Sequence, residues 1–441
     1  MVYRITLEIA KCFLLLALLL FTCCGNINNS SGEAQGRQTA SAQSGEIQEN
    51  SLRLDASQTE NISEISEILS EAKADAVQNA LLQENGETFI DLAFILERAG
   101  FSKSVLGADV LYKKADCTLV FNGESKSIAK DIFTYYLSDS SVEKDAKLFV
   151  SERILEKILG KRIIITYGGA KITDDAGKTT GAEKTNEAAA EISFEEFTYE
   201  THSWLNLSKS LVAHACGGII GINGGNSQEA LVTNYNNGHE VFEIDFRLTS
   251  DGEIAAIHGW DGYGGVRAHE DFKKIKYADV FTTMDFDDIL RIMQLNKEIY
   301  IITDTKSFED SDEYTRQMFE TLRDKAENLD KTLMKRIVPQ IYNQQMYSLI
   351  KEIYPFESIV YTLYMSPDTD AEVVDFVKNR EDIAAITMGP VRYSEEFYKA
   401  LTENGKFIYF FTLNDIDEVK GYLENGIHGI YTDFILPGDL L

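Results

Sequence analysis

The sequence predicts an α/β protein in which a (β/α)8 barrel of the TIM type, residues 197–441, follows a smaller duplicated α+β domain. From Phe197 onwards, short apolar runs such as "VFEID" and "IYIITD" alternate with amphipathic stretches such as "EEFYKALTENG". This is the pattern of strands and helices in a parallel sheet. Eight such strands are expected within about 245 residues, the usual size of this barrel. An open, doubly wound sheet is the alternative that periodicity alone leaves open.

The start of the chain resembles a bacterial lipoprotein signal peptide, residues 1–23. Its apolar run, residues 12–21, is about ten residues long and too short for a membrane-spanning helix, which needs about 20. Leu20 stands three residues before Cys23. The resemblance implies lipidation of Cys23 and an extracytoplasmic protein, lipid-anchored to the bacterial cell membrane. Cys24 is the alternative lipidation site, and a single-pass anchor is the alternative interpretation.

Two polar segments separate the predicted domains, a disordered tether at 24–80 and a linker at 168–196. Both are rich in small and polar residues and poor in aromatic ones, so neither can bury enough apolar surface to offset the entropy of the chain. Of the five cysteines, only Cys117 and Cys216 lie beyond the first 24 residues. They belong to different predicted domains, so no disulfide framework is expected.

The predicted α+β domain, residues 81–167, contains two similar sequence segments, which suggest a duplicated unit. "FIDLAFILERAG" from Phe89 and "FVSERILEKILG" from Phe149 each read as a short strand that runs into an amphipathic helix ending at glycine. Glu97, Arg153 and the Leu-Gly pair at 159–160 resemble the repeats of the copper amine oxidase N-terminal-like domain. The segment has no histidine, so no copper site is expected. Its place between two tethers suggests contact with the cell wall or surface.

The charge of the chain argues against some partners. There are 42 basic and 71 acidic residues, a net charge of −29, which repels nucleic-acid backbones and anionic bilayers. No nucleic-acid partner is expected.

Polar side chains gather where the predicted barrel strands end. Glu243 and Asp245 are two residues apart, so they face the same side of a strand, and two carboxylates on one face require a cation or a proton between them. A hard divalent ion such as Mg²⁺ or Ca²⁺ is the natural ligand for such oxygens. His214, Asp304 and Lys306 fall at the same barrel mouth, and a second histidine, in "IAAIHGW", follows the next apolar run.

These motifs resemble the glycerophosphodiester phosphodiesterases, relatives of the phosphatidylinositol-specific phospholipases C, over residues 205–441. The matching positions are His214-Ala215, Asn226-Ser227, Glu243-Ile244-Asp245, Thr249-Ser250-Asp251-Gly252, His258-Gly259, Asp304-Thr305-Lys306, Thr412-Leu413-Asn414 and Gly429-Ile430-Tyr431-Thr432-Asp433.

The resemblance implies a role for each matched residue. The implied general acid and base are His214 and His258; the implied metal ligands are Glu243, Asp245 and Asp304; the implied phosphate ligand is Lys306. Trp260 and Phe411 are expected to line the substrate pocket, with aromatic core packing as the alternative. Such residues would hydrolyse glycerophosphodiesters or related phospholipid-derived diesters with a divalent metal. The alternatives are a metal-independent, phospholipase C-like cleavage and a barrel that only binds wall or lipid phosphodiesters.

Three positions depart from the family pattern. Ala215 replaces an arginine that would contact phosphate, Gly259 replaces an aspartate, and Gly225 replaces a glutamate. The contacts with the substrate are therefore expected to differ from those in the family.

Overall fold

The computed structural model describes residues 76–106, 109–115, 117–130, 132–137, 140–167, 190–223, 225–306 and 311–440. The predicted signal peptide with Cys23, nearly all of the predicted tether and most of the predicted linker lie outside these residues. Within the described part of the chain, no helix combines the length and the hydropathy needed to cross a bilayer.

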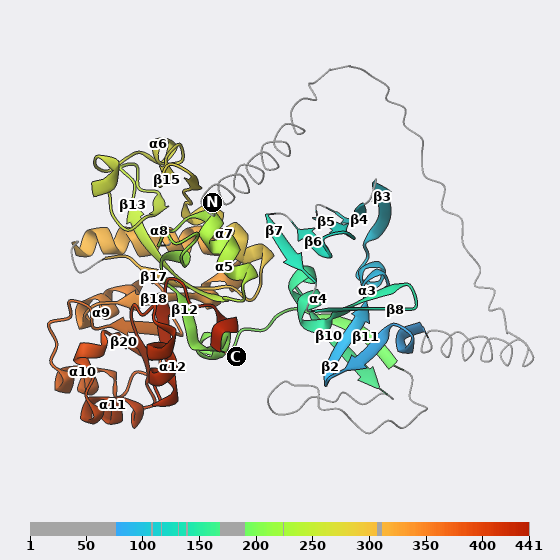
Figure 1. Ribbon diagram of the computed structural model, residues 1–441. Coiled ribbons are helices and arrows are strands. Elements are labelled where there is room, and N and C mark those ends of the chain that lie inside the picture. The colour runs from blue at the N-terminus through green and yellow to red at the C-terminus, as the bar shows by residue number, and fades with distance from the viewer. Residues whose placement is uncertain are drawn as a thin grey trace, which may run out of the picture. The chain divides into compact units, whose positions relative to one another are not determined.

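The smaller domain consists of antiparallel sheets and short helices (Figure 1). Its elements are β1 Leu81–Glu84, β2 Glu87–Asp91, α3 Leu92–Arg98, β3 Ser102–Leu106, β4 Asp109–Lys114, β5 Cys117–Asn122, β6 Ser127–Lys130, β7 Phe133–Tyr136, β8 Ser141–Lys144, β9 Lys147–Ser151, α4 Glu152–Leu159, β10 Arg162–Tyr167 and β11 Ala190–Glu195. The sheets have the strand orders β1-β2-β9-β8, β3-β4-β5-β6-β7 and β10-β11.

Two strand-to-helix units, β2–α3 and β9–α4, lie where the two similar sequence segments predict them. Their strands pair antiparallel, with Ile90 opposite Val150, and both side chains are fully buried. The Asp91 carboxylate begins α3 by accepting hydrogen bonds from the first helical N–H groups. Gly160 ends α4 in the left-handed conformation, with φ 62°, which only glycine adopts without strain.

The end of the predicted linker is structured. Residues 190–195 form β11, which pairs antiparallel with β10. The alternation of Ile192 and Phe194 with polar residues explains the strand, because it gives the segment one apolar face.

The predicted barrel is confirmed, with eight parallel strands closed into a ring. The strands are β12 Leu211–Ala213, β13 Val241–Leu248, β17 Tyr300–Asp304, β18 Ile337–Ile341, β19 Ile359–Thr362, β20 Ile383–Met388, β21 Phe407–Phe410 and β22 Gly429–Thr432. Their order is β12-β22-β21-β20-β19-β18-β17-β13, and β12 also pairs with β13. This last pairing closes the ring and excludes the open sheet.

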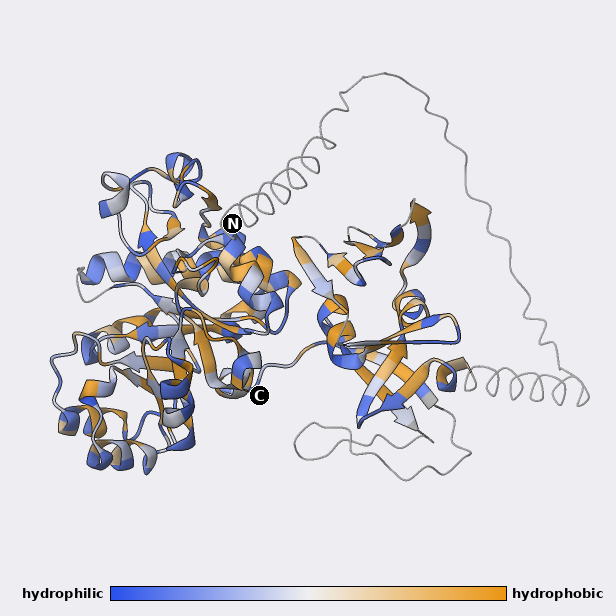
Figure 2. Ribbon diagram, in the orientation of Figure 1, coloured by the Kyte–Doolittle hydropathy of each residue, from blue (hydrophilic) through white to orange (hydrophobic). Residues whose placement is uncertain are grey.

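Helices follow the strands, as expected for βα units. They are α5 Gln228–Asn236, α7 Phe286–Leu295, α8 Asp312–Leu329, α9 Gln344–Ile353, α10 Asp370–Val377, α11 Glu395–Thr402 and α12 Ile416–Glu424. Short 3-10 helices at Ser203–Ser210, His214–Cys216, Lys331–Arg336, Pro390–Arg392 and Pro437–Leu440 complete the connections. In Figure 2 the strands are largely orange, whereas blue and orange alternate along the helices.

The barrel has an inner and an outer apolar layer. Residues that point inward form one cluster, which includes Val212, Ile302 and Tyr409. Trp204 and Leu205, just before β12, join this cluster, and the Trp204 indole donates to Ser358 Oγ at 2.7 Å. A larger cluster fills the space between strands and helices. The interior is thus a packed core, which leaves the C-terminal ends of the strands for function.

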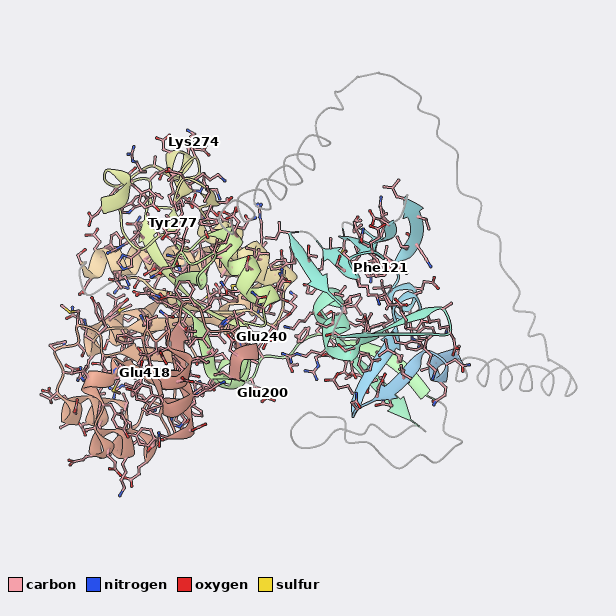
Figure 3. All side chains as sticks on the ribbon, in the orientation of Figure 1. Phe121, Glu200, Glu240, Lys274, Tyr277 and Glu418 are labelled. Atoms are coloured by element: carbon pink, nitrogen blue, oxygen red, sulfur yellow. The ribbon has the colours of Figure 1, made fainter. Side chains whose placement is uncertain are left out.

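An excursion separates β13 from α7. It contains β14 Ile254–Ala256, a 3-10 turn at Asp261–Tyr263, α6 His269–Phe272, β15 Lys276–Tyr277 and β16 Phe281–Thr282. Figure 3 labels Lys274 and Tyr277 within it.

Candidate active site

A cavity of about 260 Å³ opens at the C-terminal ends of the strands. Six predicted site residues line it: His214, Glu243, His258, Asp304, Lys306 and Phe411. The structure therefore brings together side chains from segments that are up to 197 positions apart in the sequence (411 minus 214).

Three buried carboxylates meet beside this cavity. Glu243 and Asp245 project from β13, and Asp304 ends β17 directly opposite Asp245 in the parallel register. Each offers an oxygen within 4.8 Å of the others'. Their exposed fractions are 2%, 1% and 8%. This is the grouping of oxygen ligands that a hard divalent cation requires.

The charges of this cluster are only partly compensated within the described residues. Burial and then the neighbouring charge of Asp245 raise the pKa of Glu243, and the same two causes raise the pKa of Asp304. Burial also opposes ionisation of Asp245, but the charge of Lys306 outweighs it and lowers the pKa of that carboxyl. Glu243 Oε1 is buried without a hydrogen-bond partner among the described atoms.

Lys306 places an ammonium group among the carboxylates. Its Nζ lies 2.9 Å from Asp245 Oδ1 and forms a second ion pair with Asp304. The backbone of Lys306 is left-handed, with φ 52°, and its N–H donates to Asp304 Oδ1 and to the Tyr342 hydroxyl, both at 3.1 Å. These contacts hold a strained residue at the mouth, as is common at functional sites.

His214 is oriented by a carboxylate from the last strand. Its Nδ1 lies 2.9 Å from Asp433 Oδ1, and its Nε2 is 3.9 Å from Glu243 Oε2. Burial alone lowers the pKa of His214, but the hydrogen bond to Asp433 and the charge of Glu243 outweigh it, so that the pKa rises to about 9. Asn414 Nδ2 donates to the other Asp433 oxygen at 2.8 Å.

Ala215 and Asn226 hold the two carboxylates of β13 by hydrogen bonds. Ala215 has φ 47°, and its N–H donates to Glu243 Oε2 at 2.8 Å. The Asn226 side chain brackets Asp245, because its Nδ2 donates to Asp245 Oδ2 at 2.9 Å and its Oδ1 accepts from the Asp245 N–H at 3.0 Å.

Of the two aromatic residues predicted to line the pocket, one lines the cavity and the other does not. Phe411 lines the cavity, and its ring packs edge-to-face with Tyr364, with centroids 6.1 Å apart. Trp260 does not line the cavity, so this expectation is wrong. Its indole donates to Leu248 O at 3.1 Å and packs edge-to-face against Phe272, and both contacts turn it into the excursion.

Three residues have roles at the site that the sequence did not reveal. Asp433 and Asn414, two of the matched motif positions, support His214, and Arg247, which belongs to no motif, lines the cavity. Arg247 is two residues beyond Asp245 on β13, so the strand period that linked Glu243 to Asp245 extends to it. Its Nε lies 3.5 Å from the His258 carbonyl oxygen.

The departures from the family pattern have different structural settings. A Cβ on Gly225 would lie 2.1 Å from the ring of Tyr277, which is labelled in Figure 3. Tyr277 therefore excludes the family's glutamate. At Gly259 a Cβ would meet nothing within 4 Å, so space does not explain the missing aspartate.

Comparison with protein families gives a match for residues 225–436, to the Glycerophosphoryl diester phosphodiesterase family. Residues 225–436 form a domain of this family. His214 precedes the matched segment, although it completes the cavity. Members of the glycerophosphoryl diester phosphodiesterase family are phosphoric diester hydrolases, and the family generally uses a divalent metal. The barrel is therefore that of a phosphoric diester hydrolase.

Several solved glycerophosphodiester phosphodiesterases are similar to this barrel. One from Silicibacter pomeroyi is 14% identical, covers 55% of this chain and 96% of its own, and has a TM-score of 0.45. A phosphodiesterase from Oleispira antarctica, in complex with the product sn-glycerol-3-phosphate, is 13% identical, with coverages of 52% and 94% and a TM-score of 0.43. One from Thermotoga maritima is 17% identical, with coverages of 51% and 94% and a TM-score of 0.39. A comparison with curated proteins finds no match.

Proposed function

We propose that the barrel hydrolyses glycerophosphodiesters, or related diesters derived from phospholipids, with a divalent cation and two histidines. One observation carries this proposal. Two histidines, two cations and a buried carboxylate cluster share one cavity at the mouth of a glycerophosphodiester phosphodiesterase domain. This is the set of groups that phosphodiester hydrolysis needs.

The residues present fit a divalent metal ion. Glu243, Asp245 and Asp304 supply hard oxygen ligands within reach of one another. Glu243 Oε1 is a buried acceptor with no hydrogen-bond partner among the described atoms, and a cation would satisfy it. We expect Mg²⁺ or Ca²⁺, because among the described residues the cluster consists of three carboxylates, without a thiolate or an imidazole. When bound, such an ion neutralises charge on the phosphoryl oxygens and acidifies a bound water.

The two histidines exchange protons with the reacting oxygens. Asp433 occupies His214 Nδ1, so Nε2 is the atom left to hold or release a proton. His258 lines the same cavity from beyond β14. One imidazole accepts a proton from the attacking water, whose oxygen forms a bond to phosphorus. The other gives a proton to the alkoxide that leaves as the P–O bond breaks, so the products are a phosphate monoester and an alcohol.

Cations hold the phosphate in place of the missing arginine. The Lys306 ammonium lies in the cavity between Asp245 and Asp304, and the Arg247 guanidinium enters the lining from the same face of β13 as Asp245. Because Ala215 has no charged side chain, we propose that Arg247 takes over the contact with the phosphate oxygens.

Hydrolysis of a glycerophosphodiester, with and without a chelator, tests the proposal. Loss of turnover with the chelator and its return with Mg²⁺ or Ca²⁺ are the expected results. Turnover that resists the chelator would instead favour phospholipase C-like cleavage by the histidines and a substrate hydroxyl. No turnover under any condition would favour a barrel that only binds phosphodiesters.

The location of the enzyme is also a proposal. We propose that the chain is lipid-anchored at Cys23 outside the cytoplasm and that the duplicated domain contacts the wall. One lipid on the thiol and one on the amine would give the two hydrophobic groups that stable anchoring needs. Mass spectrometry of the mature N-terminus tests this, and an intact Met1 would overturn it.

A further inference from the structure

Apolar side chains are exposed around one side of the barrel mouth. We define the apolar arc as Ile220, Tyr364, Met365, Val391, Phe411 and Phe434. Ile220 and Met365 are 85% and 67% exposed, and Val391 is fully exposed. Exposed apolar groups of this size, gathered in one region, mark a binding surface.

The arc follows the order of the strands. Its residues lie on the loops after β12, β22, β21, β20 and β19, which are five consecutive neighbours in the ring. Contacts join these loops. The Phe434 ring covers Gly218 of the β12 loop, and Tyr364 packs against Phe411. These contacts join the β12 loop to the β22 loop and the β19 loop to the β21 loop.

The arc also continues into the catalytic cavity. Tyr364 and Phe411 belong to both. The cavity holds about 260 Å³, less than the roughly 300 to 1,000 Å³ of pockets that enclose drug-sized ligands. It has room for a diester head group but not for a long hydrocarbon chain as well. A chain attached to the diester would leave past Tyr364 and Phe411 and lie along the arc.

Charge argues for a neutral occupant. Among the described positions of the arc's loops, Arg392 is the one lysine or arginine, and the His214 imidazole is paired with Asp433. Its guanidinium is engaged by the carbonyl oxygens of Leu363 and Asp368 and by the Asp370 carboxylate. With a net charge of −29 on the chain, an anionic surface would be repelled.

We propose that the apolar arc docks the barrel mouth on a surface of zwitterionic lipid, and that the diester cleaved there carries a hydrocarbon chain. This rests on the proposed function, and it narrows the substrate from soluble diesters to amphiphilic ones. Apolar contact is the driving force, so docking survives high salt, unlike binding by surface charges.

The test uses the full chain with Cys23→Ser and Cys24→Ser, so that no acyl anchor forms. The arc variant combines Ile220→Ser, Met365→Ser and Val391→Ser, whose exposure spares the fold. The matched control combines Val105→Ser, Leu106→Ser and Leu329→Ser, which are exposed apolar residues at the end of β3 and at the end of α8. Flotation with phosphatidylcholine vesicles measures binding of the protein to the lipid surface. The substrate class is tested by comparing the rate of hydrolysis of palmitoyl-lysophosphatidylcholine in those vesicles with that of soluble glycerophosphocholine.

The arc variant is expected to lose about tenfold or more of its vesicle binding and of its vesicle-substrate turnover, while its turnover of the soluble diester and both activities of the control stay unchanged. Unaltered flotation, or equal loss on both substrates, would overturn the proposal. So would a dimer that the arc substitutions convert to a monomer in sedimentation. If the protein with an intact apolar arc cleaves neither diester, the proposed function is wrong. Flotation then still tests whether the arc binds the vesicle surface.

Discussion

His214 Nδ1 and Asp433 Oδ1 lie 2.9 Å apart, although the residues are 219 positions apart in the sequence. The carboxylate fixes the ring and leaves Nε2 toward the cavity, as an aspartate does for the histidine of a hydrolytic triad. Asn414 holds the carboxylate in turn. Proton transfer by His214 should therefore depend on Asp433.

We expect Asp433→Ala to lower kcat by about 10²- to 10⁴-fold, because the aspartate that orients a triad histidine contributes up to about 10⁴ in kcat. KM should change much less, since Asp433 does not line the cavity. Steady-state kinetics measure both. Asp439→Ala removes a nearby carboxylate that bonds only the Leu436 N–H among the described contacts, and it should leave kcat unchanged. Equal losses in the two variants would contradict the role of Asp433.

The two histidines should be separable by the leaving group. His214→Ala and His258→Ala should each lose about 10² to 10⁴ in rate on a natural-type diester. A nitrophenyl diester needs no general acid, so the variant that lacks the acid should be largely rescued on it. His269→Ala is the control, because His269 pairs with Asp285 at 2.8 Å outside the cavity. Wild-type turnover in both cavity variants would refute the acid–base assignment.

Metal binding should depend on the pair from β13. Glu243→Gln and Asp245→Asn should each weaken Mg²⁺ or Ca²⁺ binding by about 100-fold or more, because each removes a charged oxygen ligand. Asp304→Asn should have a smaller effect if that carboxylate acts through water. Calorimetry measures the affinity. Asp251→Asn, on the same hairpin but outside the carboxylate cluster, is the control. Unchanged binding in the Glu243/Asp245 double variant would place the metal elsewhere.

Arg247 should govern affinity for the diester more than the chemical step. We expect Arg247→Gln to raise KM about tenfold with a smaller change in kcat, because it removes a charge-assisted contact with phosphate. Arg247→Lys should recover part of the loss. Arg267→Gln, an exposed arginine that bonds the Tyr263 carbonyl, should leave KM as in the wild type. An unaltered KM in Arg247→Gln would leave Lys306 as the phosphate ligand.

A histidine remote from the cavity should set part of the acid stability. Burial lowers the pKa of His239 to about 4, against about 6.5 in an unfolded chain. Between these values the unfolded state binds a proton that the folded state does not, so the stability from His239 is complete above pH 6.5 and is lost as the pH falls to 4. The loss is on the order of 3 kcal/mol.

Urea unfolding at pH 7 and pH 4.5 measures this contribution. His239→Gln keeps a donor for the Ile435 carbonyl, which His239 Nε2 contacts at 3.1 Å, and removes the titration. The variant should therefore lose less stability than the wild type over the same pH interval. If the wild type and the variant lose the same free energy of unfolding between pH 7 and pH 4.5, groups other than His239 control stability in acid.

Much of the fold follows from period and spacing in the sequence. The strands of the barrel are short apolar runs that occur once per βα unit, and all eight are confirmed. Glu243 and Asp245 share a face because strands have a period of two. The motif order placed Asp304 and Lys306 beside them, and the register of β13 and β17 accounts for the contact.

The remaining site residues depend on contacts that local sequence does not encode. Asp433 reaches His214 only because β22 pairs with β12, and no local pattern marks a partner 219 positions away. Trp260 follows a histidine of the motif, yet its direction is set by a loop whose backbone has no repeating geometry. Arg247 had a usable signal, the same strand period as Asp245, and was missed because it belongs to no motif.

Because β12 pairs with β22, the active site depends on the last strand of the barrel. Ala213, just before His214, pairs with Thr432, just before Asp433. The ring closes at this seam, so the first and last strands of the barrel must meet before His214 gains its carboxylate. A nascent chain that stops short of β22 contains every carboxylate of the proposed metal site and both histidines, yet lacks the oriented imidazole. Truncation before β22 would therefore remove the closure of the ring and the orientation of His214 together.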